Sequence, residues 1–183
     1  GRSSGDFRDG TIGRWRNDAL CVLDRLSEGP QFLVGSSMGA WIALLLAQAR
    51  PERIAGLLLL APAPDFTEAL IWQALPEDVR RTLLESGEWQ RPSAYEPAYP
   101  ITQNLIEEGR RHLVLDAPIA LGRPVHILHG MKDADVPWSH ALRLVERLDG
   151  NPMLTLIKDG DHRLSAPDDL KLIESALDAM VNA

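Results

Sequence analysis

The sequence is poor in cysteine, in long apolar runs and in positive charge. Cys21 is the only cysteine among 183 residues, so no disulfide can form within the chain, and a reducing compartment such as the cytoplasm is the expected location. The apolar runs are far shorter than the roughly 18 residues of a membrane-spanning helix. Lys and Arg number 19 against 26 Asp and Glu, and the resulting net charge of −7 argues against a nucleic-acid partner.

Sequence motifs that hold cofactors or metals are also lacking. Neither a phosphate-binding loop nor a G-x-G-x-x-G motif occurs, and the histidines do not form the Cys/His clusters typical of zinc sites. We therefore expect no cofactor and no metal. The length and the hydrophobic content of 45% fit a single globular domain over residues 1–183.

One stretch carries a specific chemical signal, the pentapeptide Gly-Ser-Ser-Met-Gly at residues 35–39. A short apolar run ends just before it and an apolar segment without Gly or Pro follows, so the pattern predicts strand, sharp turn and helix. That is the context of a nucleophile elbow, in which Ser37 is lifted out of the sheet. Glycine at 35 and 39 would remove Cβ atoms where strand and helix cross. The alternative is a glycine-rich turn with incidental serines.

The rest of the chain alternates short apolar runs with amphipathic segments, which predicts an α/β fold with a mostly parallel sheet of about four strands flanked by helices. Strands are expected at 31–34, 53–61, 124–129 and 153–158, and helices at 11–28, 40–50, 139–148 and 168–181.

Residues 65–122 differ in character, because they combine short helical patterns with a Pro/Tyr-rich loop at 92–100. Half of the aromatic residues of the chain lie here, Tyr95 among them. We expect this segment to be a helical lid inserted into the domain, with Trp72, and Trp138 further along the chain, binding substrate. The alternative is that these aromatic side chains only pack the insertion.

Three candidate catalytic residues each follow a predicted strand, in the chain order Ser37, Asp133, His162. A serine hydroxyl needs an imidazole to accept its proton, and the imidazole needs a carboxylate on its other nitrogen. The sequence therefore predicts a Ser–His–Asp triad, with the Met38 amide as an oxyanion donor.

Other acids and histidines compete for these roles. Asp135 could replace Asp133 as the orienting acid, although Asp133 is nearer to the strand end. We expect Asp159 and Asp161 to shape the histidine loop or to be solvated. Of the other histidines, His126 and His129 are predicted to be hydrogen-bonded structural residues, and His112 and His140 to face solvent.

The elbow at 35–39, the block His129-Gly130-x-x-Asp133-x-x-Val136-Pro137 and the loop histidine together resemble the α/β-hydrolase superfamily. Within it, the run into Trp138 resembles the palmitoyl-protein thioesterases that also act as acyl-glucuronide esterases, and their bacterial relatives. The resemblance implies hydrolysis of acyl esters or thioesters, with Ser37 as nucleophile, His162 as base and Asp133 as orienter. A serine peptidase, a carbon–carbon hydrolase or an inactive fragment are the alternatives.

Members of this family have four further strands before the elbow. We therefore expect the chain to be the C-terminal part of a longer enzyme, with residues 1–4 as the tail of an oxyanion loop and a second oxyanion donor upstream. The strand at 32–34 would then form an open apolar edge.

Overall fold

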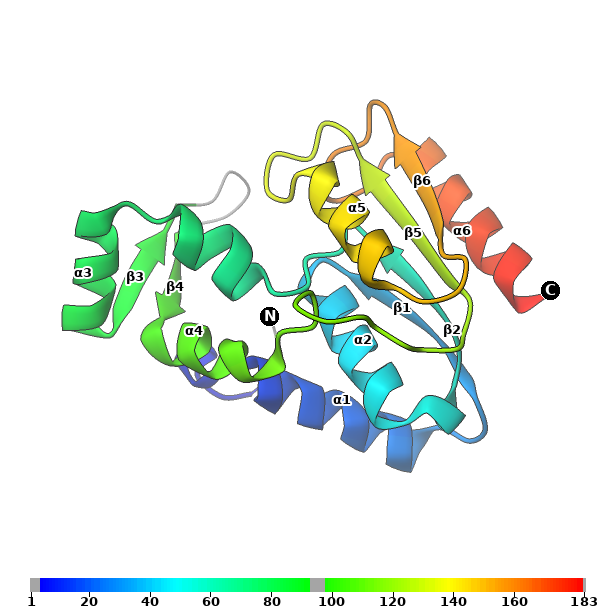
Figure 1. The fold of residues 1–183 in the computed structure, drawn as a ribbon, viewed down its shortest axis with the longest axis horizontal. Coiled ribbons are helices and arrows are strands. Elements are labelled where there is room, and N and C mark those ends of the chain that lie inside the picture. Colours follow the sequence, from blue (N-terminus) through cyan, green and yellow to red (C-terminus); the bar gives the residue numbers. More distant parts are fainter. Residues whose placement is uncertain (1–3, 93–97, 183) are drawn as a thin grey trace. The chain divides into compact units, whose positions relative to one another are not determined.

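The computed structural model describes residues 4–92 and 98–182, which form two compact units. The first combines Gly1–Asn17 with Asp65–Leu113, and the second combines Asp18–Pro64 with Val114–Ala183. Figure 1 shows the elements of both, and each unit is described by itself below.

The second unit contains the main sheet, whose four strands are all parallel and run in the order β1-β2-β5-β6. The sequence prediction of a parallel α/β sheet is confirmed, with strand ends shifted by at most two residues. The bounds are β1 Gln31–Ser36, β2 Ile54–Leu60, β5 Val125–Gly130 and β6 Met153–Ile157. Because the strands are parallel, the loops that follow them emerge at one edge of the sheet, where ligands bind in such folds.

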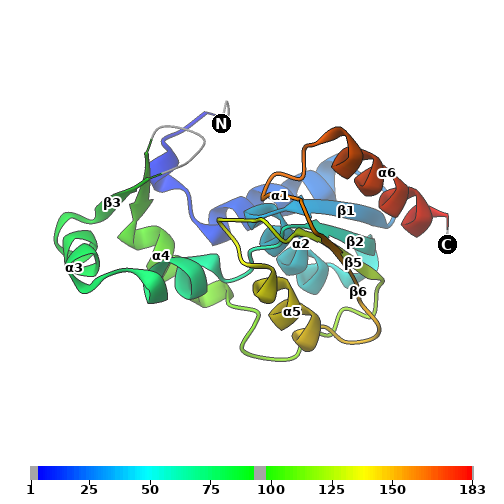
Figure 2. The same cartoon turned by 90° about the horizontal axis from the view of Figure 1, so that it is seen from above.

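Helices cover both faces of this sheet (Figure 2). α2 (Met38–Ala49) and α5 (Trp138–Arg147) lie on one face and α6 (Pro167–Val181) lies on the other. β2 is apolar along its whole length because it is buried from both sides, as central parallel strands are. On the α6 face, Leu58 and Leu128 pack against Leu164 and Ala176.

α2 is apolar around its whole circumference, and its residues 40–47 are all buried. A helix of this kind is a core helix, not a surface one. α1 (Ile12–Leu26) instead buries Ile12 and Leu23 and leaves Val22 and Leu26 more than half exposed. β1 is an edge strand of the described sheet, and its Val34 is 50% exposed. No helix in residues 4–92 and 98–182 combines the length and apolarity needed to cross a membrane.

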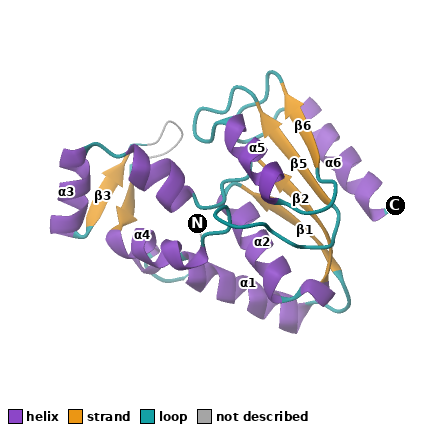
Figure 3. Ribbon diagram, in the orientation of Figure 1, coloured by secondary structure: helices purple, strands orange, loops and turns teal. Residues whose placement is uncertain are grey.

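The first unit is mainly helical, as predicted, but it also contains an antiparallel strand pair that the sequence analysis missed (Figure 3). β3 and β4 pair from Glu88↔Thr102 to Arg91↔Tyr99. The prediction of a loop at 92–100 is therefore wrong for its last two residues, whereas 93–97, with Tyr95, lie outside the described residues. The bounds are η1 Phe7–Asp9, η3 Thr67–Ile71, η4 Trp72–Ala74, α3 Glu77–Ser86, β3 Glu88–Arg91, β4 Tyr99–Thr102, α4 Gln103–Gly109 and η5 Arg110–His112.

The strand–helix crossing at the elbow explains one of its two glycines. A Cβ on Gly35 would lie 2.6 Å from the Gly39 carbonyl oxygen and 2.7 Å from the Ala40 Cα, both of them backbone atoms that cannot move aside. Apart from its chain neighbours and the adjacent backbone of α2, a Cβ on Gly39 would meet no heavy atom of the described residues within 4 Å. The expected steric role is thus found at Gly35 and is wrong for Gly39.

We accordingly predict that Gly35→Ala lowers the free energy of unfolding by about 3 kcal/mol, because β1 and α2 must separate to admit the methyl group. Gly39→Ala is the matched control. It should change stability by less than about 1 kcal/mol, since alanine suits a helix and the space is open. Urea denaturation followed by circular dichroism measures both, and equal losses in the two variants would contradict the steric explanation.

Candidate active site

Ser37 joins β1 to α2 in a strained backbone conformation, with φ 52° and ψ −119°. Residues with a Cβ tolerate such angles only where the surroundings enforce them. Here the Ser37 amide donates to the Leu60 carbonyl at 2.9 Å, and the Ser37 carbonyl accepts from Ala40 at 3.1 Å and from Ala63 at 3.2 Å. The central strand and the helix therefore hold the serine at the corner between them.

The structure brings together the three residues that the sequence pattern singled out, all within the second unit. The Ser37 Oγ lies 3.0 Å from the His162 Nε2, and the His162 Nδ1 lies 2.7 Å from the Asp133 Oδ2. Each residue follows a strand of the main sheet at its carboxyl end. Because an ionised carboxylate can only accept, the His162 Nδ1 carries the proton, which leaves Nε2 free to accept from the serine hydroxyl.

The Asp133 side chain is fully buried and surrounded by donors. Its Oδ1 accepts from the amides of Asp135 at 2.9 Å and Val136 at 2.8 Å, and its Oδ2 accepts from His162. Burial by itself would raise the pKa of Asp133, but the hydrogen bonds from His129, His162 and Val136 outweigh it and hold that pKa well below its usual range. Asp133 is therefore a carboxylate at neutral pH.

The hydrogen bond to Asp133 raises the pKa of His162 above its ordinary value, against the lowering effect of burial, and the nearby charges of Asp133, Asp135 and Asp161 add to the rise. Asp161 also shapes the histidine loop, as predicted, because its Oδ1 accepts from the amides of Arg163 and Leu164 at 2.9 and 3.0 Å. A carboxylate behind the ring thus stabilises the imidazolium that forms when the ring takes a proton.

Asp133, Asp135 and His162 also offer oxygen or nitrogen atoms within 4.8 Å of one another, a spacing that a metal ion could use. Two of the three groups are already joined by the 2.7 Å hydrogen bond between His162 and Asp133. The cluster is explained by that bond and by the amides on Asp133, so we assign no metal to it.

Met38 is the first residue of α2, and the first amides of a helix have no partner within it. Its N–H directly follows Ser37 in the chain, at the positive end of the helix dipole. Gly1, Arg2 and Ser3 lie outside the described residues, so the expected oxyanion loop at the start of the chain stays a prediction.

The two tryptophans predicted to bind substrate lie in different units. Trp138 is the first residue of α5, close in sequence to the Asp133 loop, and is 37% exposed. Trp72 belongs to the first unit, where the guanidinium groups of Arg80 and Arg110 lie over its ring at 5.4 and 4.9 Å from the ring centre. Substrate binding by either tryptophan stays a prediction.

The prediction that His140 faces solvent is wrong. The side chain is 6% exposed and its Nε2 donates to the Pro64 carbonyl at 2.7 Å, with burial lowering its pKa. His112 is half-buried and pairs with Glu108 at 2.6 Å. The error has a simple cause, because helical spacing alone does not tell which face of α5 lies against the sheet.

His126 and His129 are hydrogen-bonded, as predicted. His126 contacts the Thr155 Oγ1 at 2.9 Å, and the fully buried His129 donates to the Val136 carbonyl at 2.9 Å. Sequence reasoning missed a further contact, since the His129 Nε2 also lies 3.3 Å from the Asp133 Oδ2. The signal that could have found it is the four-residue spacing of His129 and Asp133 around a strand end.

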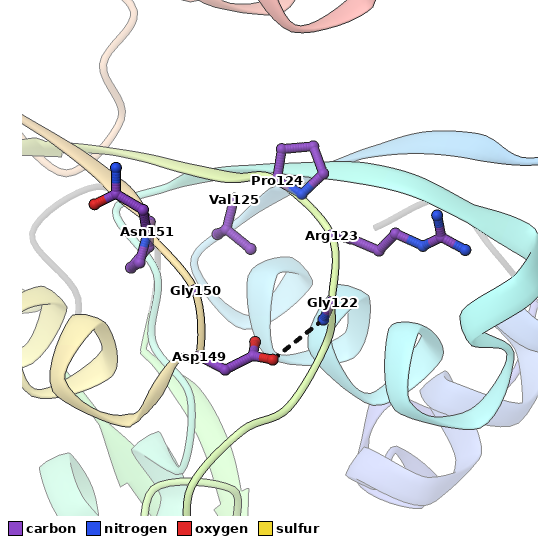
Figure 4. Close-up of a pocket in the computed structure, with 8 residues that line it drawn as sticks. Gly122, Arg123, Pro124, Val125, Asp149, Gly150 and Asn151 are labelled. Carbon is purple, nitrogen blue, oxygen red and sulfur yellow. Dashed lines mark hydrogen bonds between the residues drawn. The ribbon is translucent and has the colours of Figure 1, made fainter.

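A cavity of about 220 Å³ lies in the second unit, at the amino ends of β5 and β6 (Figure 4). Ser37, Asp133 and His162 instead follow the carboxyl ends of strands. Asp149 in its wall accepts from the amides of Leu121 at 2.9 Å and Gly122 at 3.4 Å, so its carboxylate is committed to the backbone. None of the predicted site residues lines this cavity. The lining residues are Gly122, Arg123, Pro124, Val125, Asp149, Gly150, Asn151 and Pro152.

The parallel sheet with its elbow agrees with what comparisons with known proteins find. The sequence profile of the alpha/beta hydrolase fold matches residues 1–96, and the chain belongs to the α/β hydrolase family. Among curated relatives, the chain is 39% identical over 187 residues to the mouse mitochondrial palmitoyl-protein thioesterase ABHD10 and 36% identical over 185 residues to the human one. These alignments cover the whole chain but only 62% and 60% of those proteins.

Solved structures show the same relationship. A crystal structure of a protein from Agrobacterium vitis S4 is 48% identical, with a TM-score of 0.94 over 98% of this chain and 72% of that one. The mouse alpha/beta hydrolase domain-containing protein 10 is 38% identical, with a TM-score of 0.91 over the whole chain and 74% of that protein. This chain thus spans about six tenths of the length of the two curated relatives named above.

Proposed function

We propose that this chain carries the catalytic residues of a serine hydrolase that cleaves acyl esters or acyl thioesters through an acyl-enzyme on Ser37. The observation that supports it most is the unbroken contact from the Ser37 hydroxyl to His162 at 3.0 Å and on to the buried Asp133 at 2.7 Å. A serine, a base and an orienting carboxylate in this arrangement activate a hydroxyl for attack on a carbonyl.

In the first half of the reaction, the Ser37 Oγ attacks the carbonyl carbon of the substrate while His162 Nε2 accepts the hydroxyl proton. The carbonyl oxygen becomes an oxyanion, which the Met38 N–H stabilises from the end of α2. Asp133 stabilises the imidazolium and keeps the ring oriented. His162 then gives its proton to the departing alcohol or thiol, and the acyl group remains on Ser37.

In the second half, water takes the place of the leaving group. His162 accepts a proton from the water as it attacks the acyl-enzyme, and the same proton returns to Ser37 as the carboxylic acid departs. A buried Asp133 with a strongly lowered pKa suits this cycle, because it stays charged while His162 changes protonation twice.

The names of the relatives support the proposed substrate class. The mouse and human relatives are named palmitoyl-protein thioesterases, which favours an acyl thioester on a protein as the substrate, with small acyl esters as model substrates. Exposed Trp138 at the start of α5 is our candidate for contact with the substrate, and Trp72 in the predicted lid is a second one. Those relatives are named as mitochondrial, while a cytoplasmic location for this protein stays a prediction.

A fluorophosphonate probe tests the proposal, because it phosphonylates only an activated serine. We expect an adduct on Ser37 alone, found by peptide mass spectrometry. Ser36 is the matched control, since it is exposed and next in the chain. Replacement of Ser36 by alanine should leave labelling unchanged. The proposal would be contradicted if the protein were not labelled, as expected of an inactive member of the fold, or if the label lay on another residue.

The pH dependence of that labelling is a separate prediction. His162 must be neutral to accept the serine proton, and its pKa is raised. Labelling should therefore be complete at high pH and lost as the pH falls through that raised pKa, with a midpoint above the value of about 6.5 for an ordinary histidine. A labelling rate that is constant down to pH 5 would exclude His162 as the base.

A further inference from the structure

His129 contacts the same carboxylate as His162, that of Asp133. His129 precedes Asp133 in the chain, whereas His162 follows it. His129 lies near the end of β5, its side chain is fully buried, and its Nε2 points to two oxygens. One is the Val136 carbonyl at 2.9 Å and the other is the Asp133 Oδ2 at 3.3 Å. The mechanism above makes no use of this side chain.

The protonation of the His129 ring follows from its neighbours. A carbonyl oxygen can only accept, so the Nε2 facing Val136 must carry the proton. The Nδ1 has no hydrogen-bond partner within the described part of the chain. A proton there would be a buried donor without an acceptor, which is costly. The ring therefore carries its proton on Nε2 and not on Nδ1. The Nε2–H donates to the Val136 carbonyl, and the Asp133 Oδ2 lies 3.3 Å from the same nitrogen.

The consequence concerns the orientation of Asp133. Oδ1 is held by the amides of Asp135 and Val136, and Oδ2 is held between the imidazoles of His162 and His129. Without His129, Oδ2 would have His162 as its sole side-chain donor, and that ring must also stay aligned with Ser37. His129 lies on a strand of the sheet, whereas His162 lies in a loop, so the His129 imidazole is the more firmly held of the two.

We propose that His129 is a positioning residue for the triad, in which its Nε2–H fixes the plane of the Asp133 carboxylate so that Oδ2 meets the His162 Nδ1. The same N–H ties Val136 to the strand end and so holds the loop between them. The inference rests on the proposed hydrolase function, since positioning has a kinetic meaning only if Asp133 orients the base.

The first test is made on the unaltered protein. Nitrogen-15 NMR of labelled histidine should show His129 as the neutral Nε2–H tautomer at neutral pH. A proton on Nδ1 would overturn the inference whether or not any variant folds.

The second test is kinetic and uses three variants. His129→Leu removes the donor, and we expect kcat for a p-nitrophenyl ester to fall about tenfold with KM within twofold, because the loss is in orientation of the base. His129→Gln keeps an N–H within reach of both oxygens and should recover most of kcat. His126→Leu, on the same strand but bonded to Thr155, should leave both constants unchanged. Rates are normalised to the fraction of protein that the fluorophosphonate probe labels.

Two outcomes would overturn the positioning role. One is a His129→Leu enzyme with unchanged kcat per labelled site, and the other is an equal loss in His129→Gln and His129→Leu. Neither resembles a failure of the hydrolase proposal, which would show as missing activity in the unaltered protein or as activity that survives Ser37→Ala.

Discussion

Replacing Ser37 by alanine is expected to lower kcat for a p-nitrophenyl acyl ester by about 10⁴-fold or more, because it removes the hydroxyl that forms the acyl-enzyme in the proposed mechanism. The fold should tolerate the change, since the hydrogen bonds that hold residue 37 use its backbone amide and carbonyl. Steady-state hydrolysis and fluorophosphonate labelling measure the loss directly.

Ser36→Ala is the control for Ser37→Ala. Ser36 is exposed at the end of β1, precedes the elbow and makes no contact with the triad among the hydrogen bonds of the described residues. It should keep kcat within about twofold. If Ser36→Ala lost activity as strongly, or if Ser37→Ala kept more than a hundredth of it, the nucleophile would have to be sought elsewhere.

A comparable loss, about 10⁴-fold in kcat, is expected for Asp133→Asn. The amides of Asp135 and Val136 both donate to Oδ1, so the side-chain oxygen of the asparagine must stay on that side. Its NH₂ group then faces the His162 Nδ1 and donates where the carboxylate accepted. The ring is forced into the other tautomer, with its proton on Nε2, and cannot accept from Ser37.

Asp135→Asn provides the comparison for this prediction. Asp135 is exposed and acts on His162 only as a nearby charge, so the variant should keep most of kcat and move the acidic limb of the pH profile slightly to lower pH. The sign follows because that charge raises the His162 pKa, and removing it lets the base stay neutral at lower pH. A larger loss in Asp135→Asn than in Asp133→Asn would reverse the assignment of the orienting acid.

The sequence predicted the elements of the sheet well because their signals are local. β2 and β5 are short, mostly apolar and preceded by prolines, so strand length and burial can be read directly from residues 54–60 and 125–130. The β3–β4 pair escaped prediction because Glu88–Arg91 is polar and only four residues long. What makes it a strand is its partner Tyr99–Thr102, a pairing that no local pattern displays.

The candidate site likewise contains features that the sequence could predict and features that it could not. Ser37, Asp133 and His162 could be singled out by residue type and order, since the carboxyl ends of parallel strands meet at one edge. Three other features could not be predicted from the sequence. They are the burial of His140 against Pro64, the open space around Gly39 and the contact of His129 with Asp133. Each depends on which side of an element faces another one.

By itself, the sequence determined which chemical groups are present and which strand each one follows, because backbone geometry and hydrophobic periodicity act over a few residues. The tertiary structure alone decided the distances of 3.0 and 2.7 Å that join Ser37, His162 and Asp133, and the second imidazole behind the carboxylate. The physical reason is that hydrogen bonds between residues 125 and 29 positions apart exist only once the sheet has packed between its helices.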